Sequence, residues 1–367
     1  MKAIAIVPGK GKAHVVEVEE PSINNIDEVK LEVLEVGICG TDRDEAEGGR
    51  ADPPMNENEL IIGHEMFGRV VQTGKTVKSV KKGDYALFMV RRSCGHCFFC
   101  TNNRSDLCNS GDYTERGIKG SHGFQTEYVV DKEEFLIPVP AEIRDIGVLT
   151  EPMSVVVKAI EESLLIQTTR LPGTNAETWL HGKRTLVAGL GPIGLLAAFV
   201  LKRRGAQIWG LDIVDESSSR PSIFKEIGGK YINGRNIKTE KIDDQFGEMD
   251  FIFEATGIAS LELQLMDALG INGIYVLTGI PSGDRPVCVL GAELMQKMVL
   301  RNQIMLGSVN AGKIHYLQAV NELVKIKSRF GNTINKLITE RKNYRSFRDV
   351  LDLHSPDEIK AVVEWSE

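Results

Sequence analysis

Long apolar runs and an excess of positive charge are missing from this chain of 367 residues, and cysteines are few. No run of about 18 apolar residues occurs, so a membrane-spanning helix is not expected. The formal net charge of −7 argues against partners such as nucleic acid or an anionic membrane surface. Six cysteines in so long a chain do not make the disulfide framework of a small secreted domain. Residues 1–7 alternate like a strand rather than a signal peptide, so we expect a cytoplasmic protein with reduced thiols.

The composition is that of an ordinary folded protein, with 42% hydrophobic and 26% charged residues. The chain is too long for one hydrophobic core, which predicts two domains. Small molecules are the expected partners.

The first domain is expected at 1–165, where alternating strand patterns are divided by frequent glycine turns. A cysteine-containing lobe at 91–110 interrupts these strands as an insertion. The mixed segment 311–367 is expected to return to the first domain.

The second domain is expected at 166–310, where short buried-strand runs alternate with helical patterns. Residues 185–188 form such a run, and a glycine turn, a helix at 193–202 and a strand at 207–211 follow. Two further strand runs lie at 251–253 and 274–277. This alternation is typical of a parallel sheet covered by helices.

Four cysteines lie close together, namely Cys94, Cys97, Cys100 and Cys108. Two residues between neighbouring cysteines aim their sulfurs at a common point, as a tetrahedral zinc ion requires. A disulfide framework and an iron–sulfur cluster are the alternatives; the last gap is longer than in a bacterial ferredoxin run. His96 is expected to be a solvated loop residue.

A glycine-rich turn between strand 185–188 and the following helix carries the pattern GxGxxG. Its residues are Gly189, Leu190, Gly191, Pro192, Ile193 and Gly194. Such a turn brings the backbone and a helix N-terminus to the pyrophosphate of a dinucleotide; tight packing alone is the alternative. Asp212 ends the next strand, where a carboxylate holds the adenosine ribose and repels a 2′-phosphate. NAD+ is therefore favoured, with NADP+ as the alternative if Arg220 turns toward the phosphate.

A second metal site is expected around Cys39 and His64, which each follow a strand and lie near glycines. Taken singly, each residue is more often structural. With Glu65 and Glu151 they supply sulfur, nitrogen and oxygen donors for an open zinc site.

The pattern Gly63-His64-Glu65-x2-Gly68-x5-Gly74-x2-Val77, with the cysteine lobe and the Gly189 turn in the same order, resembles the medium-chain zinc-dependent alcohol dehydrogenases. The segments 39–43, 90–92, 115–118, 151–152 and 307–310 resemble the archaeal glucose 1-dehydrogenase branch in particular. The resemblance implies an α/β fold: a β-rich GroES-like catalytic domain with a structural zinc lobe, and a doubly wound Rossmann cofactor domain.

The same resemblance implies a zinc-dependent oxidation of the C1 hydroxyl of an aldose, with D-glucose giving D-glucono-1,5-lactone. Two zinc ions per chain are implied, one held by the four cysteines and one by Cys39 and His64 with Glu65 and Glu151 as acidic ligands. A homotetramer or a homodimer is also implied.

The resemblance further assigns contacts to substrate and cofactor. Thr41 would pass a proton, although a turn hydrogen bond is its alternative role. Glu115, Glu151, Thr41 and Asn310 would bind the sugar, and Thr256, Gly257 and Asn310 would contact the cofactor.

Other roles and functions remain open from the sequence. Arg91 and Arg92 are expected in structural ion pairs or at the rim of the site, His122 and His315 in structural or surface roles, and Cys288 as a small buried residue. Galactose, another aldose, a polyol or threonine is the alternative substrate. A zinc-ribbon interaction module without catalysis and a quinone reductase-like protein are the alternative classes.

Overall fold

The computed structural model describes residues 1–49, 51–281, 286–353, 355 and 357–366. The chain divides into two compact units. The first unit comprises Met1–Ser154, Asn310–Lys325 and Asn335–Glu367, and the second comprises Val155–Val309 and Ile326–Ile334. The first division falls inside helix α3 (Thr150–Arg170), before the expected bound at residue 165.

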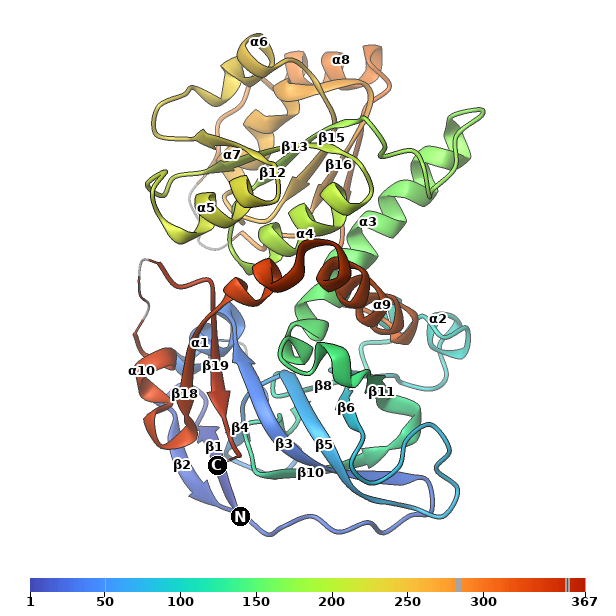
Figure 1. Cartoon of the computed structure of the whole chain (residues 1–367), viewed down its shortest axis with the longest axis vertical. Coiled ribbons are helices and arrows are strands. Elements are labelled where there is room, and N and C mark those ends of the chain that lie inside the picture. The colour runs from blue at the N-terminus through green and yellow to red at the C-terminus, as the bar shows by residue number, and fades with distance from the viewer. Residues whose placement is uncertain (50, 282–285, 354, 356, 367) are drawn as a thin grey trace. The chain divides into compact units, whose positions relative to one another are not determined.

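The first unit is built on strands, as the blue and cyan arrows of Figure 1 show. Its strands are β1 (Lys2–Ile6), β2 (His14–Glu17), β3 (Glu28–Ile38), β4 (Leu60–Ile61), β5 (Glu65–Thr73), β6 (Tyr85–Phe88), β7 (Arg91–Arg92), β8 (Thr114–Arg116), β9 (Gly120–Ser121), β10 (Tyr128–Lys132), β11 (Leu136–Val139), β18 (Ile338–Asn343) and β19 (Lys360–Glu364). Its helices include α1 (Gly40–Ala46), α2 (Phe98–Thr101) and α10 (Arg348–Leu351). Helix α9 (Lys313–Phe330) begins in this unit.

The described residues of this unit form three sheets. The largest has the order β11-β6-β5-β3-β19-β18, with β10 also pairing with β3. Two small sheets have the orders β2-β1-β4 and β7-β8-β9. The C-terminal strands β18 and β19 therefore complete a sheet that the N-terminal strands begin.

Strand β3 is central in the large sheet because its apolar residues alternate and are buried. Val29, Leu31 and Val33 are at most 1% exposed. β3 pairs antiparallel with β5 and with β19, and these pairings place Gly37 opposite both Glu65 and Val362. The ends of three strands that are distant in sequence thus meet where β3 runs into α1.

The second unit contains one six-stranded parallel sheet of order β14-β13-β12-β15-β16-β17, shown in Figure 1 in green to orange. Its strands are β12 (Arg184–Ala188), β13 (Gln207–Asp212), β14 (Lys230–Asn233), β15 (Met249–Glu254), β16 (Leu269–Leu277) and β17 (Ile304–Gly307). Its helices include most of α3, with α4 (Pro192–Arg203), α5 (Ser219–Glu226), α6 (Ile242–Phe246), α7 (Ala259–Gln264) and α8 (Gly291–Leu300). The strand order reverses between β12 and β15, which is the ligand-binding switch point of such sheets.

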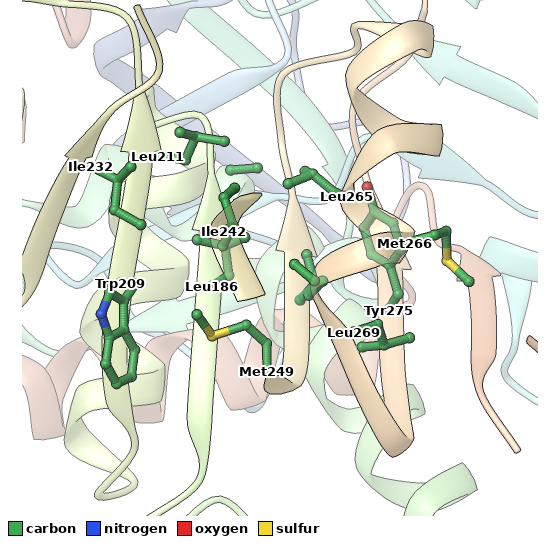
Figure 2. Close-up of a cluster of buried hydrophobic side chains, with 13 residues drawn as sticks. Leu186, Trp209, Leu211, Ile232, Ile242, Met249, Leu265, Met266, Leu269 and Tyr275 are labelled. Atoms are coloured by element: carbon green, nitrogen blue, oxygen red, sulfur yellow. The ribbon is translucent and has the colours of Figure 1, made fainter. Parts of the chain in front are cut away.

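Buried side chains from the strands pack against those of α6 and the turn at 265–268 on one side of this sheet (Figure 2). Leu186, Met249 and Tyr275 from three neighbouring strands belong to this cluster and are fully buried. Such a core holds the strands in register, so their carboxyl ends present their loops at one edge of the sheet.

The strand runs expected at 185–188, 207–211, 251–253 and 274–277 are confirmed. The sequence did not reveal β14 and β17. Short edge strands have few residues from which a pattern can be recognised.

Candidate metal centres and nucleotide site

The predicted metal ligands Cys39, His64 and Glu65 lie together in the first unit. Cys39 follows β3 and caps α1, while His64 directly precedes β5 and Glu65 begins it. Their donor atoms all lie within 4.8 Å of one another, and Cys39 Sγ is 3.1 Å from His64 Nε2. The pairing of β3 with β5 brings these residues together. Glu151 is not part of this convergent group among the described residues.

Asp42 supports this group, a role that the sequence did not reveal. Its carboxylate is fully buried and accepts a hydrogen bond from the backbone N–H of Cys39 at 2.9 Å. Its other oxygen lies 3.5 Å from Nδ1 of His64, within ion-pair range but too long for a strong hydrogen bond. Thr41 donates its backbone N–H to Cys39 Sγ at 3.2 Å. A carboxylate behind a ligating histidine commonly orients the ring.

Glu65 has a second partner that the sequence also did not reveal, the buried Lys360 of β19. The ammonium group of Lys360 lies 2.7 Å from both carboxylate oxygens of Glu65 and donates to the carbonyl of Ile38 at 3.1 Å. A Cβ atom on Gly37 would lie 2.1 Å from Glu65 Oε2, so only glycine leaves room for this carboxylate. Glu65 is therefore within reach of a metal and also held by a cation.

The electrostatics of the group follow from burial and from mutual charge. Burial raises the pKa of the Cys39 thiol, and His64 opposes this rise. Burial lowers the pKa of His64, but Cys39 and Asp42 outweigh it and leave that pKa well above its usual value. Burial raises the pKa of the Glu151 carboxyl to about 7, against the influence of His64. A metal that binds a thiol and an imidazole displaces their protons.

These residues fit a zinc ion. Catalytic zinc sites use three protein ligands drawn from cysteine, histidine and carboxylates, and they leave one position open for water or substrate. Cys39, His64 and Glu65 are such a set, and the predicted ligand Glu151 lies outside this convergent group among the described residues.

The four cysteines of the lobe also converge, with all four sulfur atoms within 4.8 Å of one another. Cys97 Sγ lies 3.9 Å from Cys108 Sγ, close to the separation of ~3.8 Å expected for thiolates around zinc at about 2.3 Å. The backbone N–H of Cys97 points at Sγ of Cys94, and that of Cys100 points at Sγ of Cys97. Hydrogen bonding from Ser110 lowers the pKa of Cys94 to about 5, while burial raises that of Cys100 to about 12. The lobe fits a four-thiolate zinc ion, which leaves no open position.

The predicted nucleotide turn lies between β12 and α4 at the carboxyl edge of the parallel sheet. Gly189 has a φ of +85°, and a Cβ on Gly194 would lie 1.8 Å from the carbonyl oxygen of Gly189. Pro192 occupies the first turn of α4, where its missing N–H costs nothing. Only glycines permit so close a turn, and it leaves the N-terminus of α4 open to a phosphate.

Asp212 ends β13 as predicted and helps to hold this turn. Its carboxylate accepts hydrogen bonds from the backbone N–H of Leu190 at 2.8 Å and of Ile213 at 2.6 Å. Arg220 lies near, with Nη1 3.8 Å from Asp212 Oδ2. Thr256 and Gly257 follow β15, and a Cβ on Gly189 would lie 2.9 Å from Thr256 Cγ2. The predicted cofactor residues 189–194, 212, 256 and 257 thus lie on loops of one sheet edge.

Other predicted contacts have partners of their own. Glu115 is ion-paired with Arg91 at 2.8 Å, and Arg92 with Asp131 at 2.7 Å, which confirms the expected structural pairs of both arginines. Asn310 adopts a left-handed conformation with a φ of +60° between β17 and α9.

Three of the histidines outside the metal group, His96, His122 and His315, have the roles expected of them. His122 Nδ1 accepts the backbone N–H of Ile61, and His315 Nδ1 accepts that of Gly312. The side chain of His96 is 64% exposed, as expected for a solvated loop.

The expectation for Cys288 is wrong, because this residue is exposed. Its neighbours Val287 and Val289 are exposed as well, so apolar character in this segment does not signal burial.

A cavity of about 620 Å³ lies in the first unit, lined among others by Glu35, Arg69 and Arg341. None of the predicted site residues lines it. Within the described part of the chain, no helix combines the length and apolar character that crossing a membrane requires.

An open mixed-donor zinc site and a dinucleotide-binding sheet in one chain define a class, the zinc-dependent dehydrogenases. The family model of the alcohol dehydrogenase GroES-like domain matches residues 25–141, and that of the glucose dehydrogenase C-terminus matches residues 144–365. The chain belongs to the medium-chain zinc-dependent alcohol dehydrogenase family, in its glucose dehydrogenase branch. Its fold is therefore a GroES-like domain with a zinc lobe and a Rossmann domain.

Relatives match the chain over its whole length. The glucose 1-dehydrogenase of Methanocella arvoryzae is 36% identical and glucose 1-dehydrogenase 2 of Vulcanisaeta moutnovskia 35% identical, each over 99% of both chains. The structure of Haloferax mediterranei glucose dehydrogenase in complex with NADP, zinc and gluconolactone is similar with a TM-score of 0.89 and 30% identity over 100% of both chains.

Proposed function

We propose that this chain is an NAD(P)-dependent zinc glucose 1-dehydrogenase, which oxidises the C1 hydroxyl of D-glucose to give D-glucono-1,5-lactone. The observation that carries the proposal is the convergence of Cys39, His64 and Glu65 in a chain that also carries the Gly189 turn. The full-length relatives named as glucose 1-dehydrogenases support the choice of sugar.

Each of the predicted site residues would have its own role in this reaction. Cys39 and His64, with Glu65 or Glu151, would hold the catalytic zinc, and the four cysteines would hold the structural one. Bound zinc would supply Lewis acidity, which lowers the pKa of a hydroxyl group, and bound NAD(P)+ would accept a hydride. Asp42 would keep the imidazole of His64 in position. Buried Lys360 would limit how far Glu65 moves toward the metal.

Proton transfer and sugar binding would fall to polar residues around the zinc ligands. Thr41 follows Cys39 by two residues, and its hydroxyl would relay the C1 hydroxyl proton toward solvent. Glu115, Glu151 and Asn310 would accept or donate hydrogen bonds to the sugar hydroxyls. Glu115 already binds Arg91 through Oε1, so its other oxygen is the one available to a sugar.

The cofactor preference depends on Asp212 and Arg220. The carboxylate of Asp212 favours NAD+, whereas Arg220 lies close enough to turn toward a 2′-phosphate. We expect activity with both cofactors and a higher kcat/KM with NAD+. Replacing Asp212→Ser should shift the ratio of kcat/KM values toward NADP+.

The test is the rate of NADH or NADPH formation from D-glucose, galactose, xylose, a polyol, threonine and ethanol. We expect aldoses to be oxidised. Cys39→Ala should abolish activity while the fold and one zinc per chain persist, and Cys288→Ala, at an exposed cysteine, is the matched control. Turnover of threonine or ethanol without any aldose oxidation would contradict the choice of sugar, and salt-sensitive DNA binding without oxidation would favour an interaction module.

A homo-oligomer, dimer or tetramer, is also proposed. Helix α8 has no buried residue, and together with Leu290, which precedes it, it exposes apolar side chains: Leu290, Val299 and Leu300 are 77%, 74% and 73% exposed. Strand β17 beside it pairs with β16 alone among the described strands, so one of its edges is free. An apolar surface next to a free strand edge suits a second copy of the chain.

Sedimentation of the purified protein tests this surface. The wild type should sediment as a dimer or tetramer, and Val299→Lys with Leu300→Lys should give smaller species. Leu353→Lys, at an exposed leucine elsewhere, should leave the assembly unchanged. A monomeric wild type would contradict the proposal.

A reducing compartment such as the cytoplasm is also proposed, because none of the six cysteines forms a disulfide.

A further inference from the structure

Glu254, the last residue of β15, is a fully buried carboxylate at the carboxyl edge of the parallel sheet. Its Oε1 accepts hydrogen bonds from the backbone N–H and hydroxyl of Thr256, each at 2.5 Å, and from the N–H of Gly257 at 3.0 Å. Its Oε2 accepts the N–H of Gly279 at 3.2 Å. Every partner is a neutral donor. An ionised carboxylate is acceptor-only, so this pattern is that of the charged form.

No cation balances this charge within the described chain, since none of its ion pairs includes Glu254. Glu262 Oε1 and the hydroxyl of Tyr275 are buried and have no hydrogen-bond partner. Burial raises the pKa of both groups, and the charge of Glu254 adds to each rise. Among the described residues, the carboxylate therefore brings to the sheet edge a negative charge that no ion-paired cation balances.

The hydrogen bonds of Glu254 tie together two loops of this edge. Gly257 follows β15 and Gly279 follows β16, and a Cβ on Gly279 would lie 2.2 Å from the backbone nitrogen of Gly257. The first of these loops also touches the glycine turn after β12, because a Cβ on Gly189 would lie 3.0 Å from the carbonyl oxygen of Ala255. One side chain thus fixes the relative positions of loops that follow adjacent strands.

The strand order assigns these loops to one half of the cofactor. Dinucleotides bind across the switch point, which lies here between β12 and β15. Asp212 ends β13 on one side of that point and is placed for the adenosine ribose. The nicotinamide half must therefore extend to the other side, over the carboxyl ends of β15 and β16 where Glu254 lies.

We infer that the buried charge of Glu254 makes the enzyme prefer the oxidised cofactor, in addition to positioning the loops at 255–257 and 278–280. The inference rests on the proposed dinucleotide-linked function. The nicotinamide ring of NAD(P)+ is cationic and that of NAD(P)H is neutral, so a nearby anion stabilises only the oxidised form. Glu254 is a positioning residue that selects the oxidation state of the ligand.

The experiment measures dissociation constants of NAD+, NADH and AMP by titration calorimetry of the full chain without sugar. For Glu254→Gln, which keeps the shape and removes the charge, the ratio of Kd for NAD+ to Kd for NADH should rise about tenfold, equivalent to about 1.4 kcal/mol. AMP, which lacks the nicotinamide, should bind as to the wild type.

Glu254→Asp separates charge from geometry and serves if the glutamine variant does not fold. It keeps the charge but shortens the side chain, so both dinucleotides should bind less tightly while their ratio stays within about twofold of the wild type. Equal weakening of NAD+ and NADH in Glu254→Gln, or a tenfold change of the ratio in Glu254→Asp, would overturn the inference. A wild type that binds neither dinucleotide would instead overturn the proposed function.

Discussion

At the scale of single residues, the group of Cys39, His64 and Glu65 depends on partners outside this convergent set of predicted ligands. Asp42 accepts the N–H of Cys39 and faces Nδ1 of His64 from a fully buried position. Asp42→Asn should lower the affinity of the catalytic site for zinc by about 10- to 100-fold, because the carboxylate that orients the ligands is lost. Competition with a chromophoric chelator measures this.

The matched control is Asp44→Asn, on the exposed face of the same helix α1. It should bind both zinc ions as the wild type does. Unchanged zinc affinity in Asp42→Asn would exclude the supporting role.

The ion pair of Lys360 with Glu65 is the second interaction on which this group depends. It is buried, since both side chains are at most 4% exposed. Lys360→Met leaves a buried carboxylate without its cation and should cost about 3–5 kcal/mol of the free energy of unfolding. The double variant with Glu65→Gln should regain much of this loss because the unpaired charge is gone. Urea unfolding of the four proteins in a double-mutant cycle, with zinc in excess, gives the interaction energy.

Lys342→Met in the neighbouring strand β18 is the control, because that side chain is 41% exposed and should change stability by only ~0.5 kcal/mol. Additive effects of the Lys360 and Glu65 substitutions would show that the pair does not act as one unit.

At the scale of elements, Asp131 joins strand β10 to β7 and β8 through Arg92 and Arg116. Burial alone would raise the pKa of Asp131, but the two arginines outweigh it and hold that pKa below its usual value. The folded pKa thus lies below the unfolded pKa of about 3.9, so the ion pairs stabilise the fold above that pH and their contribution is lost as the pH falls through the folded pKa.

Asp131→Asn should therefore cost about 3 kcal/mol of the free energy of unfolding at pH 7, and the difference from the wild type should shrink below about pH 4. Urea unfolding at a series of pH values checks this. Asp352→Asn, at an exposed aspartate, should lack any such pH-dependent difference. A difference that stays constant down to pH 3 would contradict the assignment.

At the scale of the whole molecule, both zinc-type clusters belong to the first unit, whereas the nucleotide turn belongs to the second. Removal of zinc by a chelator should therefore raise amide hydrogen exchange around residues 37–42 and 94–110. Strands β12, β13 and β15 should remain protected, and AMP should still bind. Loss of protection throughout the second unit would show that zinc supports both units.

Much of the fold and of the candidate site could be predicted from local patterns. The Gly189 turn and the Cys94–Cys108 lobe are short-range motifs whose spacing itself restricts the geometry, and their convergence follows from a few backbone turns. Lys360 lies 295 residues from Glu65, and no local pattern relates the two. Asp42 was visible in the motif after Cys39, but its direction toward His64 depends on how β5 pairs with β3. Whether Cys288 is buried or exposed likewise depends on how the chain packs around it and not on the residue type.

The sequence by itself determined the class of chemistry, because thiolate spacing, a glycine turn and strand-helix alternation are local and their physical requirements are strict. Only the tertiary structure decided which charges meet. It placed a cation on Glu65 and a carboxylate behind His64, and among the described residues it gave Glu254 no ion-pair partner at the sheet edge. Pairings of this kind depend on strand register between distant segments, and register is set by packing of the whole sheet rather than by any one motif.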